Sequence, residues 1–523
     1  MVRSPAKWLS ALLILVIVGA ISFVLFWEDK GIADQNTSYN TKRGHKKEKT
    51  DTSGLNKEGR KSKASSQKDQ NEKADSASDS DSEENSAQFP PRVKSSRSRL
   101  IMHGPKLSEF KSELNKIEKT TRWYRDKRRS QKHPFIGVAT EYRAKIYPNT
   151  RGKGSAISYA RRGSRFPVKS LVNGTGCEGG EWYKKGGPGY ICTAKGFSIH
   201  KKETPPRDVY IPPDLYKAEP YEYAEVSHDD ALLYRRPPTS EERDSAEEAL
   251  SKGEKLPSYV SRRMQGDFTI AMGREETVGG AVYVRTSKNR YVLKEDLKKF
   301  PLREMHGEVL GPHKKLPIAF VYKPKASVHK IVNGEPIVVG LAQKHARFHA
   351  NRVLKREDGF WVFDDDDHAL KRKDVRICRT RTQPKRLRGV KRWIHVDLSE
   401  QTIIAYKGKK PVFATLISSG IPSRRTPLGL YRINYKQVST TMSGPDDEVG
   451  WYDIAEVPWT MYYRNLYAIH GAYWHNDFGK KKSHGCTNMA PADAKWLFHW
   501  TLPNRPIGWH SVRDSGTYVW FTN

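Results

Sequence analysis

The sequence predicts a mainly β protein whose folded part follows an N-terminal transmembrane helix and a disordered linker. Three observations lead to this prediction. Only 36% of the 523 residues are hydrophobic, so part of the chain cannot lie in a packed core. Residues 8–27 form an uncharged apolar run. From Phe135 onward, short apolar runs alternate with turns that contain glycine or proline, which is typical of β-strands.

The apolar run at residues 8–27 predicts a membrane anchor in residues 1–30. At about 1.5 Å per residue its length matches the roughly 30 Å hydrocarbon core of a bilayer. Arg3 and Lys7 precede it, so the positive-inside rule predicts export of everything after Lys30. A cleaved signal peptide is the alternative, but its apolar stretch is usually about 7–15 residues long. We expect an inner-membrane anchor and a periplasmic or cell-envelope location for the rest.

The charge balance indicates the kind of partner. Lys and Arg number 93 against 59 Asp and Glu, a formal net charge of +34, which favours nucleic acid, anionic lipid or an acidic polymer. Export removes nucleic acid from these alternatives. Four cysteines in so long a chain, with no Cys-x-x-Cys pair, exclude a small disulfide scaffold and a zinc finger.

Residues 31–99 are rich in Ser, Lys, Asp and Glu and cannot bury enough apolar surface to fold. They predict a flexible spacer with a relaxed reach of roughly 50 Å. In the segment 100–134, the 3-4-3 spacing of Leu107, Phe110, Leu114 and Ile117 predicts one short amphipathic helix that docks on the next domain.

Residues 135–205 read as a small β-barrel of short strands separated by glycine-rich turns. Cys177 and Cys192 lie 15 residues apart, and in an exported chain they are expected to form a disulfide rather than two free thiols. The basic-Tyr-Pro turn, Trp182 and the closing residues 189–191 resemble the bacterial SH3-like domain.

Residues 206–263 predict a linker with one helix, because Thr239 and Glu242 fit a capping box. Residues 264–380 predict a second β-rich region that resembles the first, SH3-like one. The four aspartates at 364–367 lack the spaced ligands of a calcium loop, so a solvated turn is favoured over a calcium site. Cys378 is expected to be buried and inert.

The chemistry is expected in residues 391–523. Strand-like runs at 393–398, 402–406, 411–420 and 429–435 predict a β meander. Beyond it, Gly485 precedes Cys486, so the backbone can turn tightly there, and a helix is predicted from about Pro491. Amides near a helix start can stabilise a thiolate or an oxyanion. His470 or His484 can supply a general base, which together predicts acyl transfer through a thioester.

Two other interpretations compete. The first is a zinc site from His470, His475, His484 and Cys486, but the spacing matches no usual zinc pattern. The second is a structural cysteine in an aromatic core. The flanking glycine and polar residues argue against it.

These residues resemble the L,D-transpeptidase (YkuD-type) family over about residues 391–502. The family signature is His-Gly followed by Ser/Thr-His-Gly-Cys-x-Arg/Asn and a later Asp. It corresponds here to His470-Gly471, Ser483-His484-Gly485-Cys486-Thr487-Asn488 and Asp493. Asn488 replaces the commoner arginine, which puts in doubt any ion pair made by that arginine but not the chemistry.

The resemblance implies a mixed β-sandwich in which Cys486 attacks the third residue of a peptidoglycan tetrapeptide stem and expels D-Ala. His470 would be the base, oriented by the Gly471 carbonyl, with His484 beside the thiol and amides near Gly485 and Cys486 as the oxyanion hole. Residues 436–459 would form a flap. Trp474, Ser483, Thr487, Asn488 and Tyr462 would contact the substrate. No metal or organic cofactor is implied, and we expect a monomer.

The expected product is a 3→3 cross-link. Three alternatives stay open: water as acceptor (an L,D-carboxypeptidase), a protein lysine as acceptor (wall–protein attachment), and a non-catalytic protein that binds peptidoglycan. The stem carboxylates are anionic, so the net charge is expected to attract the chain to the wall.

Overall fold

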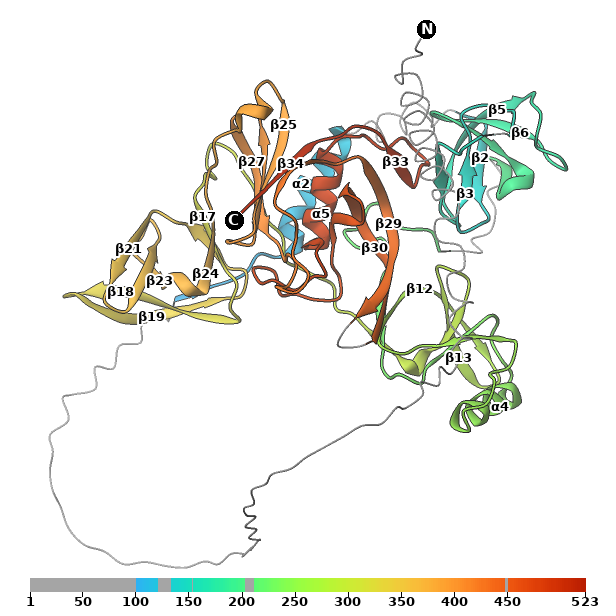
Figure 1. Cartoon of the computed structure of the whole chain (residues 1–523), viewed down its shortest axis with the longest axis horizontal. Coiled ribbons are helices and arrows are strands. Elements are labelled where there is room, and N and C mark those ends of the chain that lie inside the picture. Colours follow the sequence, from blue (N-terminus) through green and yellow to red (C-terminus); the bar gives the residue numbers. More distant parts are fainter. Residues whose placement is uncertain (1–99, 121–132, 153, 203–210, 447–449) are drawn as a thin grey trace, which may run out of the picture. The chain divides into compact units, whose positions relative to one another are not determined.

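The computed structural model describes residues 100–120, 133–152, 154–202, 211–446 and 450–523, and these are mainly β (Figure 1). They fall within one packed unit, Lys94–Asn523. The predicted anchor at residues 1–30 and the spacer at 31–99 lie outside the described residues. Among the helices that the structure describes, none has both the length and the hydropathy needed to cross a membrane.

The first β unit is an open sheet with the strand order β7-β6-β5-β2-β8. Its elements are β2 (Phe135–Ala139), β3 (Ala144–Ile146), β4 (Ser158–Ala160), β5 (Arg165–Val172), β6 (Trp182–Lys185), β7 (Tyr190–Cys192), η1 (Thr193–Lys195) and β8 (Phe197–Lys201). The predicted barrel does not close, because β3 and β4 pair only with each other and meet the sheet through a single bridge, Tyr147 to Tyr190. A disulfide joins Cys177 to Cys192.

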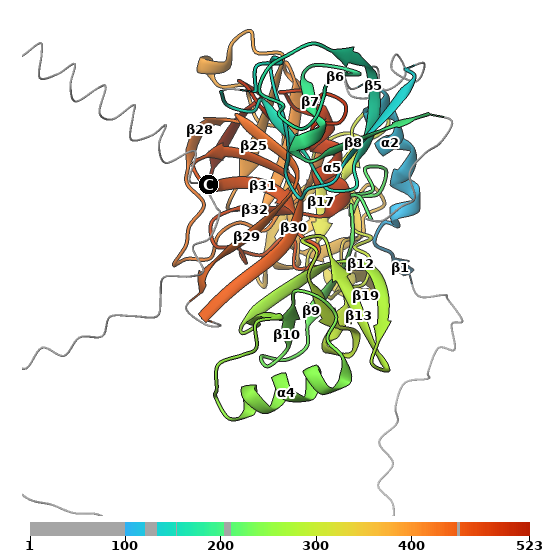
Figure 2. The ribbon, with the colours of Figure 1, turned by 90° about the vertical axis from the view of Figure 1, so that its right-hand side faces the viewer.

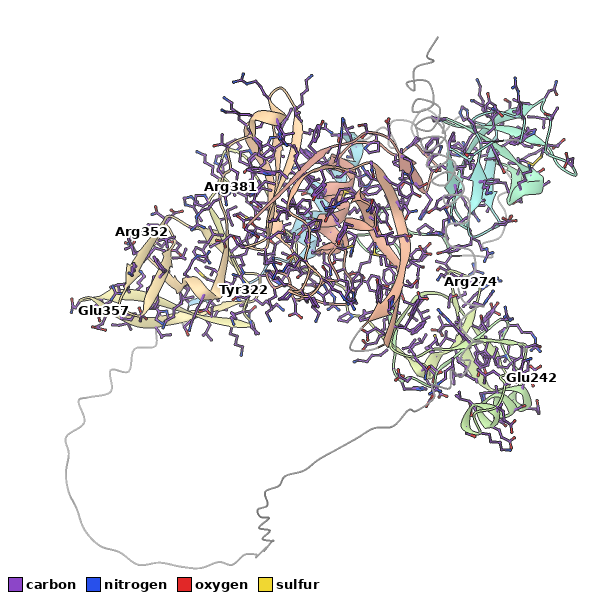
Figure 3. All side chains as sticks on the ribbon, in the orientation of Figure 1. Glu242, Arg274, Tyr322, Arg352, Glu357 and Arg381 are labelled. Carbon is purple, nitrogen blue, oxygen red and sulfur yellow. A yellow bond between two sulfur atoms is a disulfide. The ribbon has the colours of Figure 1, made fainter. Side chains whose placement is uncertain are left out.

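The second β unit begins inside the segment predicted as a linker. It contains β9 (Glu222–Val226), β10 (Leu232–Tyr234), α4 (Ser240–Ser251), β11 (Val260–Arg263), β12 (Asp267–Val278), β13 (Ala281–Thr286), β14 (Tyr291–Leu293), η2 (Lys294–Asp296) and β15 (Leu297–Lys299). The capping box of Thr239 and Glu242 is confirmed, and Arg236 pairs with Glu242. Figure 3 labels Glu242 beside α4. β9 and β10 were not predicted because three to five residues carry too little periodicity.

The third β unit begins at Ile318. The region 264–380, which we predicted as one unit, therefore supplies strands to the second unit, the third unit and, through β16, the C-terminal part. Its elements are β1 (Leu100–Met102), β17 (Ile318–Val321), β18 (Lys325–Val332), β19 (Glu335–Gln343), β20 (Arg347–His349), β21 (Arg352–Arg356), β22 (Gly359–Phe363), β23 (Ala369–Lys371), η3 (Arg372–Asp374) and β24 (Val375–Cys378). β1 pairs in parallel with β19, far along the chain, which no local pattern could indicate.

The C-terminal part contains two sheets and a buried helix. Its elements are β16 (Glu308–Val309), η4 (Lys385–Leu387), β25 (Arg392–Asp397), β26 (Thr402–Lys407), β27 (Lys410–Leu416), β28 (Gly429–Arg432), β29 (Tyr435–Asp446), β30 (Gly450–Arg464), β31 (Tyr467–Gly471), β32 (Thr487–Met489), α5 (Pro491–Trp500), β33 (Ser511–Arg513) and β34 (Tyr518–Thr522). The predicted meander is the β27-β26-β25 part of one sheet, and β34 is inserted between β25 and β28. One core cluster joins residues of both sheets to α5, for example Ile394, Met461 and Leu497.

Segments upstream of the meander complete this core. The predicted amphipathic helix is α2 (Leu107–Thr120), and its Phe110 and Leu114 are buried in the same cluster as α5. Lys495 of α5 is fully buried, pairs with Glu118 of α2 and donates to the carbonyl of Tyr216. Asp493, also of α5, accepts the N–H of Gly307 at 2.7 Å. Charged groups without solvent are stabilised only by such partners, so these segments belong to the same folding unit.

Candidate active site

The site forms where two parallel strands lie side by side. β31 pairs antiparallel with β30 and parallel with β32, with His470 opposite Asn488 (Figure 2). Because Cys486 directly precedes β32, this register brings the His-Gly motif and the Cys motif to adjacent strands. His470 is almost completely buried.

Residues 483–486, which we call the cysteine turn, are fixed by hydrogen bonds. Thr426 Oγ1 donates to the Gly485 carbonyl at 2.8 Å and accepts the N–H of Gly420 at 2.9 Å. Ser483 Oγ accepts the N–H of Gly485 at 3.1 Å and donates to the Cys486 carbonyl. The carbonyl groups of Gly485 and Cys486 and the N–H of Gly485 are therefore all hydrogen-bonded before any substrate binds.

Gly485 is required by the shape of this turn. Its φ is +114°, a region that L residues rarely adopt, and a Cβ there would lie 2.7 Å from Cε1 of Tyr467. We predict that Gly485→Ala slows acylation of Cys486 by about 100-fold or more, the size of losing one oxyanion donor. Intact-mass spectrometry with a reactive acyl donor measures the rate.

The matched control is Gly311→Ala, because a Cβ at Gly311 meets no atom within 4 Å. This variant should acylate like the wild type. Equal rates for the two variants would show that the turn tolerates a side chain and would refute the geometric argument.

Cys486 carries a partly exposed thiol whose Sγ donates to the Leu466 carbonyl at 3.7 Å. Burial raises the pKa of this thiol to about 11, against a smaller lowering by the backbone of Ala468. No described residue accepts a hydrogen bond from the N–H of Cys486. That N–H is available to an oxyanion, whereas the N–H of Gly485 already donates to Ser483.

His470 is held as a neutral imidazole. A carbonyl only accepts, so the 3.1 Å contact with the Gly471 carbonyl places the proton on Nδ1 and leaves Nε2 free to accept one. Burial lowers the pKa of His470 to about 4, and the bond to Gly471 raises it by less. At neutral pH the resting pair is therefore a thiol and an imidazole, not an ion pair.

His484 occupies a different environment. It is exposed, and its ring stacks on Tyr452 of β30 with the centroids 5.0 Å apart and the planes inclined by 21°. The two histidines that the sequence offered as a base thus differ: His470 is buried and fixed, and His484 faces the hairpin of β29 and β30.

The predicted substrate contacts fall into two groups. Trp474 is partly buried and stacks on His470 with the ring centroids 5.8 Å apart. Burial raises the pKa of the Tyr462 phenol, and the nearby Cys486 thiol raises it further. Ser483, Thr487 and Asn488 are buried. Their side chains therefore support the cysteine turn and β32 from within the protein.

Asn488 has a partner that takes the place of an ion pair. Nδ2 of its side-chain amide lies 2.9 Å from Nε2 of His475, and because an amide N–H only donates, Nε2 of His475 accepts this hydrogen bond. The sequence named Asn488 but missed His475 as its partner.

The zinc alternative finds no support, because no three of the ligand atoms of His470, His475, His484 and Cys486 lie close enough together to share an ion. Among the described residues, the ligand atoms that do so belong to Asp364, Asp366 and His368. Asp364 closes a turn by accepting the N–H groups of Asp366 and His368, and Asp367 pairs with Arg352.

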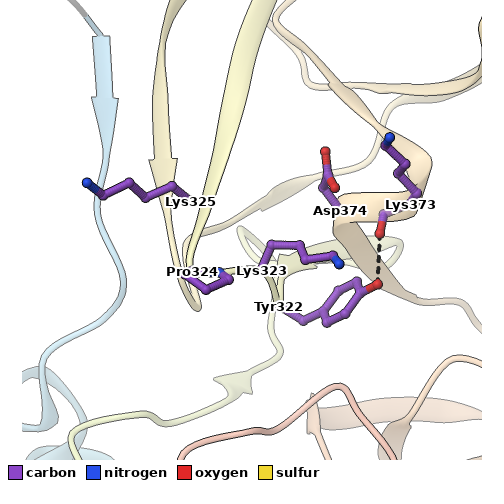
Figure 4. Close-up of a pocket in the computed structure, with 6 residues that line it drawn as sticks. All are labelled: Tyr322, Lys323, Pro324, Lys325, Lys373 and Asp374. Atoms are coloured by element: carbon purple, nitrogen blue, oxygen red, sulfur yellow. Dashed lines mark hydrogen bonds between the residues drawn. The ribbon is translucent and has the colours of Figure 1, made fainter. Parts of the chain in front are cut away.

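A hollow of about 600 Å³ lies in the third β unit, away from the cysteine turn (Figure 4). Its lining residues are Tyr322, Lys323, Pro324, Lys325, Lys373 and Asp374. They offer no nucleophile with a base. The hollow is open, and three of its six lining residues are lysines.

Residues 391–508 match the YkuD family model, described as an L,D-transpeptidase catalytic domain. Among solved structures the chain is similar to an L,D-transpeptidase (Yku) from Stackebrandtia nassauensis, with 22% identity over 26% of this chain and 57% of that chain and a TM-score of 0.19. It is similar to the catalytic domain of the Enterococcus faecium L,D-transpeptidase, with 28% identity over 25% and 96% of the two chains and a TM-score of 0.21.

An L,D-transpeptidase from Mycobacterium smegmatis is similar at 16% identity over 33% of this chain and 78% of that chain, with a TM-score of 0.21. This chain thus spans little more than half the length of the Stackebrandtia nassauensis protein. A comparison with curated proteins gives no match.

Proposed function

We propose, from the premise that residues 391–508 are an L,D-transpeptidase catalytic domain, that the chain forms 3→3 peptidoglycan cross-links through a thioester on Cys486. The observation that carries this proposal is the cysteine turn, which holds the thiol beside the strand of a buried, neutral His470. A nucleophile, a base and an unengaged N–H are what acyl transfer requires.

In the first half-reaction the thiol leaves the Leu466 carbonyl and gives its proton to Nε2 of His470 as Sγ attacks the carbonyl carbon of the third stem residue. The N–H of Cys486 donates to the oxyanion. The C–N bond to D-Ala breaks, His470 returns the proton to the leaving amine, and a thioester remains.

In the second half-reaction the side-chain amine of another stem attacks the thioester. His470 accepts the proton of that amine, the C–S bond breaks, and the thiol is restored as the new amide forms. Because the thiol pKa is about 11 and the imidazole pKa about 4, the proton transfer accompanies attack and does not precede it.

The proposed place of action is the cell envelope, with the chain held at the inner membrane by residues 1–30 and acting as a monomer. Two features support an exported enzyme. The Cys177–Cys192 disulfide is of a kind that persists in oxidising compartments, and the net charge of +34 favours an anionic wall polymer.

Product analysis tests the proposal. The full chain incubated with tetrapeptide muropeptides should release D-Ala, gain the mass of an acyl-tripeptide and yield 3→3 dimers. Tripeptides without dimers would indicate water as the acceptor. A tripeptide that stays on the protein after hydroxylamine, which cleaves the Cys486 thioester, would indicate a lysine. A protein that takes up no mass and releases no D-Ala would contradict the proposal and favour a non-catalytic wall-binding role.

A further inference from the structure

The strands β29 and β30 span the residues predicted as the flap, 436–459. This hairpin continues the sheet of the second β unit (Figure 1). β12 pairs in parallel with β30, placing Asp267 opposite Tyr452 and Phe268 opposite Asp453. The hairpin is thus joined to the second β unit by backbone pairing as well as by side chains.

Side chains secure this junction. Arg262 of β11 donates to Asp453 Oδ2 at 2.6 Å, and its guanidinium lies over the ring of Phe268 at 4.5 Å. Thr269 Oγ1 accepts the N–H of Ala455 at 2.8 Å. Charge-assisted bonds of this kind are the stronger ones, and the Asp453 carboxylate is only 10% exposed, so water competes weakly for it.

A buried centre lies three residues further along β30. Glu456 is fully buried at a φ of +46° and accepts hydrogen bonds from Tyr142 at 2.6 Å, Arg161 at 3.1 Å and Ser287 at 3.2 Å. Tyr142 and Arg161 belong to the first β unit, and Ser287 to the second. An uncommon backbone conformation is therefore maintained by residues far upstream in the chain.

The same strand reaches the cysteine turn. Tyr452 stacks on His484, which lies two residues before Cys486. Consecutive residues of a strand face opposite sides. Asp453 faces Arg262 on one side of β30, and Tyr452 therefore faces the other side. A displacement of this segment would therefore move the stacked ring and the turn beside it.

We propose that Arg262 is a positioning residue for acylation of Cys486: the second β unit holds the hairpin β29–β30 through Arg262 and Asp453, and Tyr452 passes that position to His484. This inference rests on the proposed function for its catalytic readout. It gives the second β unit a role at the active site in addition to any contact with the wall.

The test compares Arg262→Met with Arg263→Met in the full chain. Arg263 is the next residue of β11, and its partner Asp230 lies within the second β unit, so it is a matched control. We expect Arg262→Met to lower kcat/KM for D-Ala release about tenfold and to speed hydrogen exchange in residues 450–464. Arg263→Met should leave both unchanged, and Arg262→Lys should restore most of the rate.

A double-mutant cycle distinguishes positioning of the active site from a general effect on stability. If Arg262 acts through Tyr452, the effects of Arg262→Met and Tyr452→Ala on acylation are less than additive, whereas independent stability effects add. Additive effects, or equal rates for Arg262→Met and Arg263→Met in folded protein, would overturn the inference.

Failure of the proposed function would look different. In that case the wild type itself would release no D-Ala. Hydrogen exchange and the rate at which iodoacetamide alkylates Cys486 would still report the hairpin and the turn. An Arg262→Met variant that matches the control in both measurements would then refute the positioning role by itself.

Discussion

Cys486→Ala removes the acyl-enzyme and lowers D-Ala release by about 10⁴-fold or more, because the variant has no atom that can form the thioester. The expected result is an unchanged intact mass after incubation with tetrapeptide or with a carbapenem. Folding should be preserved, since Cys486 is partly exposed and its side chain contacts only backbone groups, those of Leu466 and Ala468.

The matched control is Cys378→Ala, the other free cysteine. Cys378 is completely buried, and burial raises the pKa of its thiol far above the ordinary range. This variant should form the adduct at the wild-type rate. A Cys486→Ala enzyme that still gains the mass of the acyl group would contradict the cysteine mechanism, whatever the activity of the control.

His470→Asn is the second large effect, with an expected loss of about 10²–10⁴-fold in kcat/KM for D-Ala release. Asparagine can still donate to the Gly471 carbonyl but offers no base at the position of Nε2. The comparison is His484→Phe, which keeps a ring against Tyr452 and should fall by less than about tenfold. The reverse order of the two losses would show that His484 is the base.

The pH profile gives an independent check on the same residue. Burial lowers the pKa of His470 to about 4, so the imidazole is neutral and able to accept a proton above that pH. The thiol pKa of about 11 keeps Cys486 protonated below that value. Acylation in the wild type should therefore be nearly constant from about pH 5 to 9 and fall below about pH 4. A steep rise through neutrality would indicate a free thiolate.

The residues that could be predicted from the sequence are those that act within a few positions of one another. The cysteine turn, the helix after it and the capping box of α4 depend on residues close together in the sequence. The glycine before the cysteine predicts the turn, and the threonine three residues before the glutamate predicts the capping box. The helix α2 was visible because Leu107, Phe110, Leu114 and Ile117 repeat along one face.

The parts that could not be predicted are contacts across long separations. Nothing in residues 260–270 indicates a pairing with Tyr452, because a parallel strand pair leaves no local signature. The bond of Asn488 to His475 was missed for a related reason: a buried polar pair is recognised only when both partners are placed. The third β unit was merged with the second because turns and strands alternate on both sides of residues 300–317.

The contacts of α5 bear on how small an active fragment can be. The family match begins at residue 391, but the indole of Trp459 donates to the Ala218 carbonyl, and Asp493 and Lys495 bind groups at Gly307 and in α2. Cutting the chain at 391 would remove the Gly307 N–H from Asp493, which keeps Thr415, and would remove both Glu118 and the Tyr216 carbonyl from Lys495. Each lost partner of a buried polar group costs about 1–3 kcal/mol. We therefore expect a fragment that begins at residue 391 to be less stable than a chain that keeps α2 and the segments before the meander.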